Sequence, residues 1–425
     1  MKIGRATPVI AAVLATVLAA LLVVNLQSGE KQITQRVVHA YTVADPQFLR
    51  AMGVLLGPAL VHGNRTSTLL NGDEIFPAML QAIRSASKSI TFETYIYWSG
   101  EIGREFADAL AERAHNGVKV HVLLDWVGSQ KMEESYLDSM REAGVEIEKY
   151  HPPKWYTLDK LNNRTHRKLL VVDGRVGFIG GVGIADKWRG HAQDPDHWRD
   201  THYRIEGPAV AQMQAAFTDN WAKVTGNVLH TVEYFPLLQE AGTQFAQVFK
   251  SSIDGGAESM HLMYLLSIAA ASKTIQLSMA YFVPDDTALQ AIIDAAHRGV
   301  KVQILLPGPH TDAELVKRAS RATWGAALAA GVEFYEYQPT MFHCKVLTVD
   351  RLWVSVGSTN FDTRSFRLND EANLNVYDRD FAQRQAAIFD EDVKHARRVT
   401  YEEWAARPFT EKLWERTVAL IAAQL

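Results

Sequence analysis

One eight-residue pattern occurs twice in this chain, first as His166-Arg167-Lys168-Leu169-Leu170-Val171-Val172-Asp173 and again as His343-Cys344-Lys345-Val346-Leu347-Thr348-Val349-Asp350. Small residues begin seven positions after each aspartate, as Gly180-Gly181-Val182-Gly183 and as Gly357-Ser358-Thr359-Asn360. Single matches of this kind arise by chance, but two at corresponding places do not. The pattern therefore predicts a duplicated domain.

The flanking sequence repeats in the same order. Ser87-Lys88-Ser89-Ile90 returns as Ser272-Lys273-Thr274-Ile275, Gly117 to Leu124 returns as Gly299 to Leu306, and Gly144-Val145-Glu146 returns as Gly331-Val332-Glu333, at offsets of 185, 182 and 187 residues. Solenoid repeats are far shorter, at about 20 to 50 residues. We therefore expect two similar domains, at residues 60–230 and 240–405, in a chain whose 425 residues exceed one ordinary domain.

Strand and helix patterns alternate within each half. In the first half, β-rich residues 90–97 precede a helical spacing over 101–115, which Gly117 ends before an apolar strand at 118–124. The second half repeats this order at 275–283, 286–297 and 300–306. Such βαβ units predict an α/β fold with a largely parallel, buried sheet and helices on its faces.

The histidine and lysine of each copy are two residues apart, so on a strand they point to the same face. His166 with Lys168, and His343 with Lys345, can therefore reach one pocket where the halves meet. The motif's aspartates, Asp173 and Asp350, have the opposite parity and end the apolar run, with Asp173-Gly174 typical of a tight turn. Although we count both aspartates among the catalytic motif residues, we expect their role to be structural.

Two histidines and two lysines at one site suit the cleavage of a phosphodiester. This reaction needs positive charge on the nonbridging oxygens, a nucleophile, and an acid for the leaving oxygen. The lysines supply the charge, while one imidazole attacks phosphorus and the other moves the proton. We expect neither a metal nor another cofactor, because a lysine beside each histidine opposes cation binding.

A carboxylate behind each imidazole would fix its tautomer and orientation. Asp200 and Glu371, which lie 34 and 28 residues after the histidines of their own halves, are the candidates. For either acid considered alone, the alternative role is a surface salt bridge.

The ends of the chain differ from its middle. Residues 8–26 are uncharged and long enough to span a membrane, which favours an uncleaved N-terminal anchor over a cleaved signal or a buried helix, with an anchor and linker at residues 1–40. The flanking charges favour an inside N-terminus only slightly.

Residues 406–425 are expected to form an amphipathic helix that docks on the body or, alternatively, lies in the membrane surface. Lys154-Trp155-Tyr156 fits a lip near lipid or ordinary packing equally well.

The double motif matches that of the phospholipase D superfamily, and the resemblance covers nearly everything from about residue 60 to 405. Three segments resemble bacterial cardiolipin synthases, namely Asn162-Asn163-Arg164-Thr165-His166-Arg167-Lys168, Trp198-Arg199-Asp200-Thr201-His202, and Ser358-Thr359-Asn360-Phe361-Asp362-Thr363-Arg364-Ser365-Phe366 with Asn369-Asp370-Glu371. The resemblance implies two phospholipase D-like αβα sandwich domains with the site at their interface, preceded by an N-terminal transmembrane helix.

The same resemblance implies the reaction. Such enzymes transfer a phosphatidyl group from one phosphatidylglycerol to another and release glycerol through a phosphatidyl-histidine, with His166 as nucleophile and His343 as acid/base. Asn360, Ser358 and Gly181 would support the substrate phosphate. The first half departs from the family by having Gly183 where Asn is usual. Losing one preorganised donor can cost about 10²- to 10³-fold in rate, so we expect reduced activity or a substitute donor nearby.

Other functions remain open at this stage. A hydrolytic phospholipase D would use water in place of the acceptor alcohol, and a noncatalytic lipid-binding scaffold would agree with Gly183. A nuclease is disfavoured, because a net charge of −4 gives no basic footprint for nucleic acid. The expected partners are phosphatidylglycerol and a membrane, the expected location is the cell inner membrane with a single N-terminal anchor, and the side of the globular part and the oligomeric state are left open.

Overall fold

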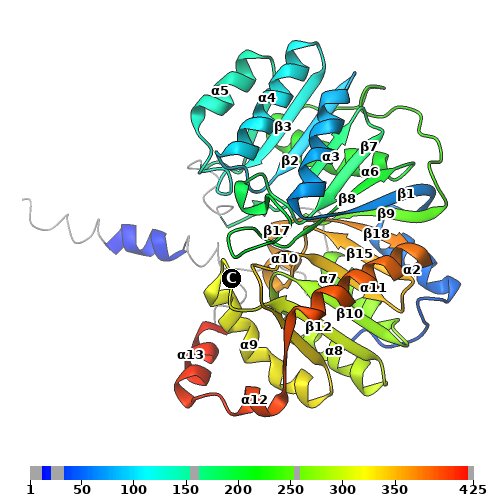
Figure 1. Ribbon diagram of the computed structural model, residues 1–425, viewed down its shortest axis with the longest axis vertical. Coiled ribbons are helices and arrows are strands. Elements are labelled where there is room, and N and C mark those ends of the chain that lie inside the picture. Colours follow the sequence, from blue (N-terminus) through cyan, green and yellow to red (C-terminus); the bar gives the residue numbers. More distant parts are fainter. Residues whose placement is uncertain (1–11, 21–32, 154–161, 253–258, 420–425) are drawn as a thin grey trace, which may run out of the picture.

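The computed structural model describes residues 12–20, 33–153, 162–252 and 259–419. Within these residues the two halves share one 15-stranded sheet, in the order β19-β13-β12-β10-β14-β15-β18-β9-β1-β8-β7-β6-β2-β3-β4. Figure 1 shows the first half above the second, with helices on both faces of the sheet. The strand order on one side of the β9–β1 junction repeats on the other, which confirms the predicted duplication and the α/β fold.

The first half contains seven strands of this sheet: β1 (Val61–Leu70), β2 (Ser89–Thr94), β3 (Lys119–Asp125), β4 (Glu146–Tyr150), β6 (Leu169–Val172), β7 (Val176–Gly180) and β8 (Thr201–Glu206). Its helices are α3 (Asn71–Ser85), α4 (Glu101–His115), α5 (Glu134–Glu142) and α6 (Val210–Thr225). The predicted helix at 101–115 agrees with α4 at both ends, because Gly117, at φ +85°, adopts the left-handed conformation that stops it.

The second half repeats this set with β9 (Gln244–Lys250), β10 (Thr274–Met279), β12 (Lys301–Pro307), β13 (Glu333–Tyr337), β14 (Lys345–Val349), β15 (Trp353–Gly357) and β18 (Ala372–Tyr377). An edge strand, β19 (Ala396–Val399), is added beside β13. The helices are α7 (Ser259–Ala269), α8 (Asp286–His297), α9 (Glu314–Ala329) and α11 (Arg379–Lys394). Helix α8 has the bounds predicted from its spacing.

The expectation of a largely parallel sheet is only partly correct. In the first half β2, β3 and β4 are parallel, but β6 is antiparallel to both β2 and β7. β6 and β7 form a β-hairpin, because the tight turn after Val172 reverses the direction of the chain. Their pairing is therefore antiparallel. The corresponding strands of the second half pair in the same way.

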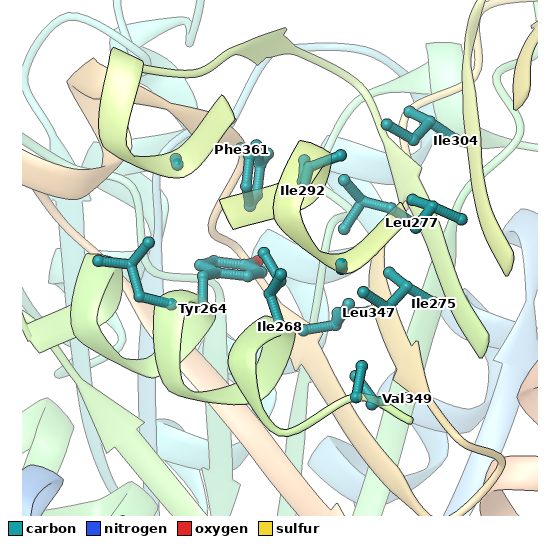
Figure 2. Close-up of a cluster of buried hydrophobic side chains, with 14 of the residues drawn as sticks. Tyr264, Ile268, Ile275, Leu277, Ile292, Ile304, Leu347, Val349 and Phe361 are labelled. Atoms are coloured by element: carbon teal, nitrogen blue, oxygen red, sulfur yellow. The ribbon is translucent and has the colours of Figure 1, made fainter. Parts of the chain in front are cut away.

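Both faces of the sheet are covered by helices, so its central strands, such as β2, β6, β14 and β15, are buried along their whole length. On one face, α6 and α11 pack on a core that runs across both halves and includes Leu169, Val171, Val346 and Val354. On the opposite face each half has a core of its own. Figure 2 shows part of this core in the second half, where helical Ile292 and Tyr264 meet strand residues such as Leu277 and Leu347. This three-layer arrangement holds the motif strands rigidly from both sides.

Three backbone connections join the halves. β1 pairs with β9 in antiparallel fashion, β5 (Arg164–Thr165) pairs with β17 (Asn369–Asp370), and a bridge links Arg199 to Phe342. The sequence patterns did not predict α2 (Pro46–Leu56), which precedes the first half along the chain but packs in the core of the second. There the Phe48 ring meets the edge of Trp353 at a centroid distance of 5.0 Å.

The chain ends only partly fall within the described residues. Residues 12–20 are helical and stand apart from the body in Figure 1, while the rest of the 8–26 segment lies outside the described residues, as do Lys154-Trp155-Tyr156. No helix in the part that is described has the length and apolar character needed to cross a membrane. At the other end, α12 (Tyr401–Ala405) leads to α13 (Phe409–Ala419). Helix α13 docks through buried Val418 and leaves Leu413 and Trp414 exposed.

Candidate active site

A cavity of about 600 Å³ opens between the two halves at the two motifs. Both motif histidines and Lys168 line it, together with Asn360. His166 and Lys168 lie in the extended segment between β5 and β6, and the second motif leads into β14 in the same way. The structure thus brings together the two histidine and lysine pairs that the sequence placed 177 residues apart.

His166 is held by a carboxylate and by backbone contacts from the other half. Its Nδ1 lies 2.9 and 3.0 Å from the two carboxylate oxygens of Glu371, and its backbone N–H donates to the carbonyl of Asp370 at 2.8 Å. Because an ionised carboxylate only accepts hydrogen bonds, the proton of the neutral ring is on Nδ1. The lone pair of Nε2 is therefore the free nucleophilic position of this ring.

His343 has the equivalent arrangement with a shorter carboxylate. Its Nδ1 lies 2.7 Å from Oδ2 of Asp200, and its backbone N–H donates to the carbonyl of Arg199 at 2.7 Å. Two indoles pack around the ring, with centroids 5.4 Å away for Trp188 and 5.5 Å away for Trp198. The imidazole is thus fixed in position by aromatic packing as well as by its hydrogen bond.

The carboxylates are exchanged between the halves, which corrects the sequence expectation. We expected each histidine to use the acid of its own half, but His166 contacts Glu371 and His343 contacts Asp200. The exchange follows from the junction of the halves, because the pairing of β5 with β17 and the Arg199 to Phe342 bridge bring each motif beside the other half's acid. Neither half alone holds a complete set of groups.

The two lysines contact the histidine backbones and raise the positive potential of the site. Lys168 donates to the carbonyl of His166 at 2.8 Å, and Lys345 donates to the carbonyl of His343 at 2.6 Å. The ammonium of Lys345 also lies 3.2 Å from each ring nitrogen of His343. Both side chains are buried, which is costly for a cation unless an anion joins it.

Burial and the nearby lysine charges lower the pKa values of the histidines and lysines in the site. Burial lowers the pKa of His166 to about 4, with Lys168 adding to the effect and Glu371 opposing it. Burial likewise lowers the pKa of Lys168 to about 7, and burial together with Lys345 lowers the pKa of His343. The lowered pKa values keep both imidazoles neutral at pH 7, and a bound phosphate would raise these pKa values again.

The carboxylates behave in the opposite way. Burial alone would raise the pKa of Asp200 and Glu371, but the facing histidine and lysine outweigh it and hold both pKa values below the ordinary range. Both acids are fully buried and ionised. They can therefore orient the rings and stabilise the imidazolium form when a proton arrives.

The small-residue segments play different parts in the two halves. Buried Ser358 donates through Oγ to Glu371 at 2.5 Å, whereas a side chain at the equivalent Gly181 would approach Oδ1 of Asp200 to 2.3 Å. Trp188 occupies the role of donor there, with Nε1 2.9 Å from Asp200. Each carboxylate thus accepts a supporting hydrogen bond, from a hydroxyl in one case and from an indole in the other, and Gly181 leaves room for the Asp200 carboxylate.

Asn360 lines the cavity, and its buried Oδ1 has no hydrogen-bond partner among the described residues. The equivalent Gly183 packs on Ile96, where an added Cβ would lie 2.8 Å from the Ile96 Cβ. Ile96 also lines the cavity. The Ile96 side chain therefore fills the space that an asparagine at position 183 would need, so Asn360 has no amide counterpart in the first half.

Asp173 and Asp350 lie at the far end of the motif strands, away from the cavity. Asp173 accepts hydrogen bonds from the backbone N–H groups of Ser87, Lys88 and Ser89 at 2.7 to 3.1 Å. Asp350 makes the same contacts with residues 272–274. Both carboxylates fasten the start of a neighbouring strand, which is the structural role that their parity indicates.

Several residues that shape the site were not singled out from the sequence. Trp188 supports Asp200, and Arg199 binds Asp392 of the other half through two hydrogen bonds of 2.9 Å. Tyr95 packs on the His166 ring at 5.2 Å. For Arg199, the sequence offered one indication, which is its position between Trp198 and the candidate Asp200. Among the described residues, no group of three or more His, Cys, Asp or Glu side chains is arranged to hold a metal ion.

A duplicated α/β fold with two histidine and lysine pairs over one cavity defines the class as the phospholipase D superfamily. The chain belongs, more particularly, to the family described as cardiolipin synthase, PLD-like domain, which matches residues 79–221 and 264–393. Both the expected fold and the expected resemblance are thereby confirmed.

Curated relatives agree over most of the chain. A cardiolipin synthase of Geobacillus kaustophilus is 36% identical over 365 residues, which cover 85% of this chain and 72% of the relative. Cardiolipin synthase 2 of Bacillus anthracis is 35% identical, with coverage of 85% and 70%, and cardiolipin synthase A of Pseudomonas syringae is 34% identical, with coverage of 92% and 81%.

Solved structures share the fold at low sequence identity. The crystal structure of a phosphatidylserine synthase from Haemophilus influenzae has a TM-score of 0.64 and 14% identity, and covers 89% of this chain and all of its own. A polyphosphate kinase from Porphyromonas gingivalis has a TM-score of 0.54 and 11% identity, with coverage of 88% and 53%. At such identities these likenesses describe the fold alone.

Proposed function

We propose that this chain is a phosphatidyltransferase of the cardiolipin synthase type, which transfers a phosphatidyl group from one phosphatidylglycerol to a second and releases glycerol. The observation that carries the proposal is the pair of histidines, each oriented by a carboxylate of the opposite half, over one cavity with two buried lysines. The identity of 33 to 37% with curated cardiolipin synthases supports the choice of substrate.

The first step forms a covalent intermediate. The Nε2 lone pair of His166 attacks the phosphorus of phosphatidylglycerol, a P–N bond forms, and the P–O bond to glycerol breaks. His343 gives its proton to the leaving glycerol oxygen. Lys168, Lys345 and the Asn360 amide stabilise the charge on the nonbridging oxygens. The anionic phosphate raises the pKa of His343, so substrate binding itself favours the protonated acid.

The second step reverses these roles with a new alcohol. Neutral His343 accepts the proton of a terminal hydroxyl on a second phosphatidylglycerol, and that oxygen attacks phosphorus. The P–N bond to His166 breaks, which returns the histidine to its neutral form and releases cardiolipin. Asp200 stabilises the imidazolium form of His343 in both steps, and Glu371 does the same for the substituted His166 ring.

The proposed location is the inner membrane, with the 8–26 segment as the anchor. Within its described part, residues 12–20, the helix exposes Val13, Leu14, Val17 and Leu18, which supports contact with lipid. Removal of residues 1–32 should shift the protein from the lipid fraction toward the soluble fraction in vesicle flotation. Unchanged flotation would contradict the anchor.

The activity is tested by product analysis. The full chain, purified in detergent, is incubated with phosphatidylglycerol, and lipids and glycerol are identified by mass spectrometry beside His166→Ala and His343→Ala. Cardiolipin and glycerol in equal amounts are expected from the wild type only. Phosphatidic acid without cardiolipin would mean hydrolysis, and absent turnover with retained lipid binding would mean a scaffold.

A further inference from the structure

Helix α13 turns its apolar side away from the body. Of its four large apolar side chains only Val418 is buried, whereas Phe409 is 77% exposed, Leu413 54% and Trp414 49%. Phe409, Leu413 and Arg416 follow one another at helical spacing and so lie on one face. A surface helix of a soluble protein ordinarily does the reverse and buries its apolar stripe.

The inner face of α13 is rich in charge by contrast. Glu411 and Glu415 are four residues apart and face the body, where Glu411 pairs with Arg321 at 3.1 Å and Glu415 with Arg407 at 2.6 Å. They are the only two carboxylates of the described helix. Its exposed side chains therefore carry no negative charge, and Arg416 adds a positive one.

The neighbouring contacts fix the position of α13. Trp404 of α12 donates through Nε1 to the carbonyl of Arg321 on α9 at 2.7 Å, and its ring fills the space beside Gly325 of the same helix. The guanidinium of Arg407, which leads into α13, lies over the Trp404 ring at 4.4 Å. The exposed side chains of α13 are thus held outward by the way in which α12 and α13 dock on α9.

The end of α13 lies close to the wall of the active-site cavity. Val418 belongs to a small apolar cluster with Val283 and Val316, against which Tyr281 packs. Tyr281 also lines the cavity, and its hydroxyl donates to Asp312, another residue of the cavity wall, at 2.8 Å. A surface that receives the outer face of α13 is therefore brought near the cavity.

The N-terminal segment reaches the body in the same region. Thr287, in the first turn of α8, donates its hydroxyl to the carbonyl of Ile33 at 3.3 Å. Helix α8 follows soon after β11 (Phe282–Val283), which contributes Val283 to the cluster around Val418. Seven residues separate Ile33 from the end of the proposed anchor at residue 26, a length of chain that spans at most about 25 Å. A membrane that holds the anchor is thus within reach of α13.

We propose that the outer face of α13 rests on the surface of an anionic bilayer and holds the active-site cavity beside the lipid. The inference rests on the proposed function for the nature of this lipid, because phosphatidylglycerol is anionic. Phe409 and Leu413 enter the boundary between head groups and acyl chains, while the Trp414 indole lies at its polar edge and Arg416 contacts lipid phosphates. Together with the anchor, the helix gives the body two points of attachment.

A second copy of the chain fits this surface less well. Phe409 and Trp414 can each bury about 150 to 250 Å², and Leu413 adds less. Together they fall short of the roughly 800 Å² that each partner buries in a stable protein interface. A lipid surface has no such threshold, because α13 adds to an attachment that the anchor already provides.

The first test measures the depth of α13 in lipid and needs no turnover. The full chain with Leu413→Cys is spin-labelled and reconstituted in phosphatidylglycerol vesicles, and electron paramagnetic resonance compares access of oxygen and of a water-soluble nickel complex to the label. The native Cys344 is buried, and labelled wild type gives the background. The label at position 413 is expected about 5 to 10 Å inside the head-group boundary.

The control label is Leu55→Cys on α2, which Figure 1 shows at the opposite side of the body from α13. This label should remain accessible to the nickel complex. Equal access of the complex to both labels would overturn the inference. Protection at position 413 accompanied by dipolar broadening between labels would mean that a second copy covers the helix, and would overturn it as well.

The second test asks whether the contact serves the reaction. Phe409→Gln with Leu413→Gln should lower kcat/KM for phosphatidylglycerol in vesicles by about three- to tenfold, because the loss of apolar area weakens one of two attachments. The same variant in detergent should keep the wild-type kcat/KM for a water-soluble, short-chain phosphatidylglycerol. Val54→Gln with Leu55→Gln, a matched exposed pair on α2, should change neither value.

The outcomes separate this inference from the proposed function. All four substituted side chains are exposed, so the melting temperature should stay at the wild-type value. Equal loss on both substrates, or no loss on either, would overturn the inference while the proposed function stands. A label at position 413 buried in lipid, in a chain whose wild type makes no cardiolipin, would support the membrane contact and refute the proposed function alone.

Discussion

The two sides of the cavity hold the same histidine and lysine but surround them differently. On one side, His166 is fixed by Glu371, which Ser358 supports through its hydroxyl. On the other, His343 is fixed by Asp200, which Trp188 supports through its indole N–H. The supporting donor is thus a hydroxyl on one side and an indole on the other.

This difference indicates how a duplicated fold becomes a single enzyme. The proposed reaction uses one phosphate centre with two histidines in different roles, a nucleophile and an acid/base, so it does not require the two halves to remain identical. Each half also depends on the other for the carboxylate of its histidine. The site is therefore a property of the joined halves, and changes to corresponding residues should have unequal effects.

The largest effect is expected from the histidines themselves. His166→Ala and His343→Ala should each lower the transfer rate by about 10⁴-fold or more, and the double variant should be little worse, because the two groups act as a unit. Steady-state cardiolipin formation measures the rate. In His343→Ala, intact-mass analysis should detect phosphatidyl-His166 if His166 is the nucleophile. An adduct on His343 in His166→Ala instead would reverse the assigned roles.

The exchanged carboxylates come next. Glu371→Gln and Asp200→Asn should each lower kcat by about 10²- to 10⁴-fold, because the amide favours the wrong tautomer and cannot stabilise the imidazolium. Each substitution should change the pKa of a different histidine. Since each anion raises the pKa of its own partner, Glu371→Gln should lower the pKa of His166 and leave His343 nearly unchanged, as followed by histidine ring NMR. A shift of His343 instead would contradict the exchange.

Sequence patterns predicted the regular elements and the reacting groups, but not the way in which the halves share them. Helices α4 and α8 followed from local spacing, and His166, Lys168, His343 and Lys345 from the repeated motif. The candidate acids were assigned to the histidines of their own halves, because separations of 34 and 28 residues along the chain favour pairing within a half. The structure joins residues 205 and 143 apart instead.

The reason for this limit is physical. Local spacing reports which face of a strand or helix a residue occupies, whereas the exchange depends on how the β1 to β9 junction turns one half onto the other. The same applies to α2, whose apolar face is evident from the sequence but whose partner lies in the second half. The contact of Trp188 with the His343 ring of the other half also forms only at this junction.

A smaller effect distinguishes the two lysines by pH. The pKa of Lys168, lowered to about 7 by burial, predicts that kcat/KM falls as the pH rises past 7, by about tenfold per pH unit at most, because the neutral amine no longer attracts phosphate. Bound phosphate raises this pKa, so kcat should decline only at higher pH. Lys168→Arg keeps its charge and should abolish the decline in kcat/KM, whatever its maximum rate. Lys345→Arg serves as the control, and a decline that persists in Lys168→Arg would assign it elsewhere.

The smallest effect concerns the asymmetric small-residue segments, where Asn360 faces the cavity and Gly183 does not supply an amide. Gly183→Asn alone should fail to raise activity and should destabilise the fold by about 1 to 3 kcal/mol, because its Cβ would lie 2.8 Å from the branched Ile96 side chain. The melting temperature and the transfer rate measure both parts of this prediction. Adding Ile96→Ala should recover only part of the lost stability, because alanine removes the Cγ2 atom that would lie 3.2 Å from the new Cβ but keeps the Ile96 Cβ. Ile96→Ala alone is the control.

The double variant decides whether the missing amide limits the enzyme. If a second amide is useful, Gly183→Asn with Ile96→Ala should transfer a few times faster than Ile96→Ala alone. The gain should be well short of the roughly 10²- to 10³-fold ascribed to a single oxyanion donor, because Asn360 and Lys168 already line the cavity. An equal or lower rate would mean that the side bearing His343 works best with an apolar wall at Ile96. The halves would then differ by adaptation to unlike roles rather than by loss of a donor.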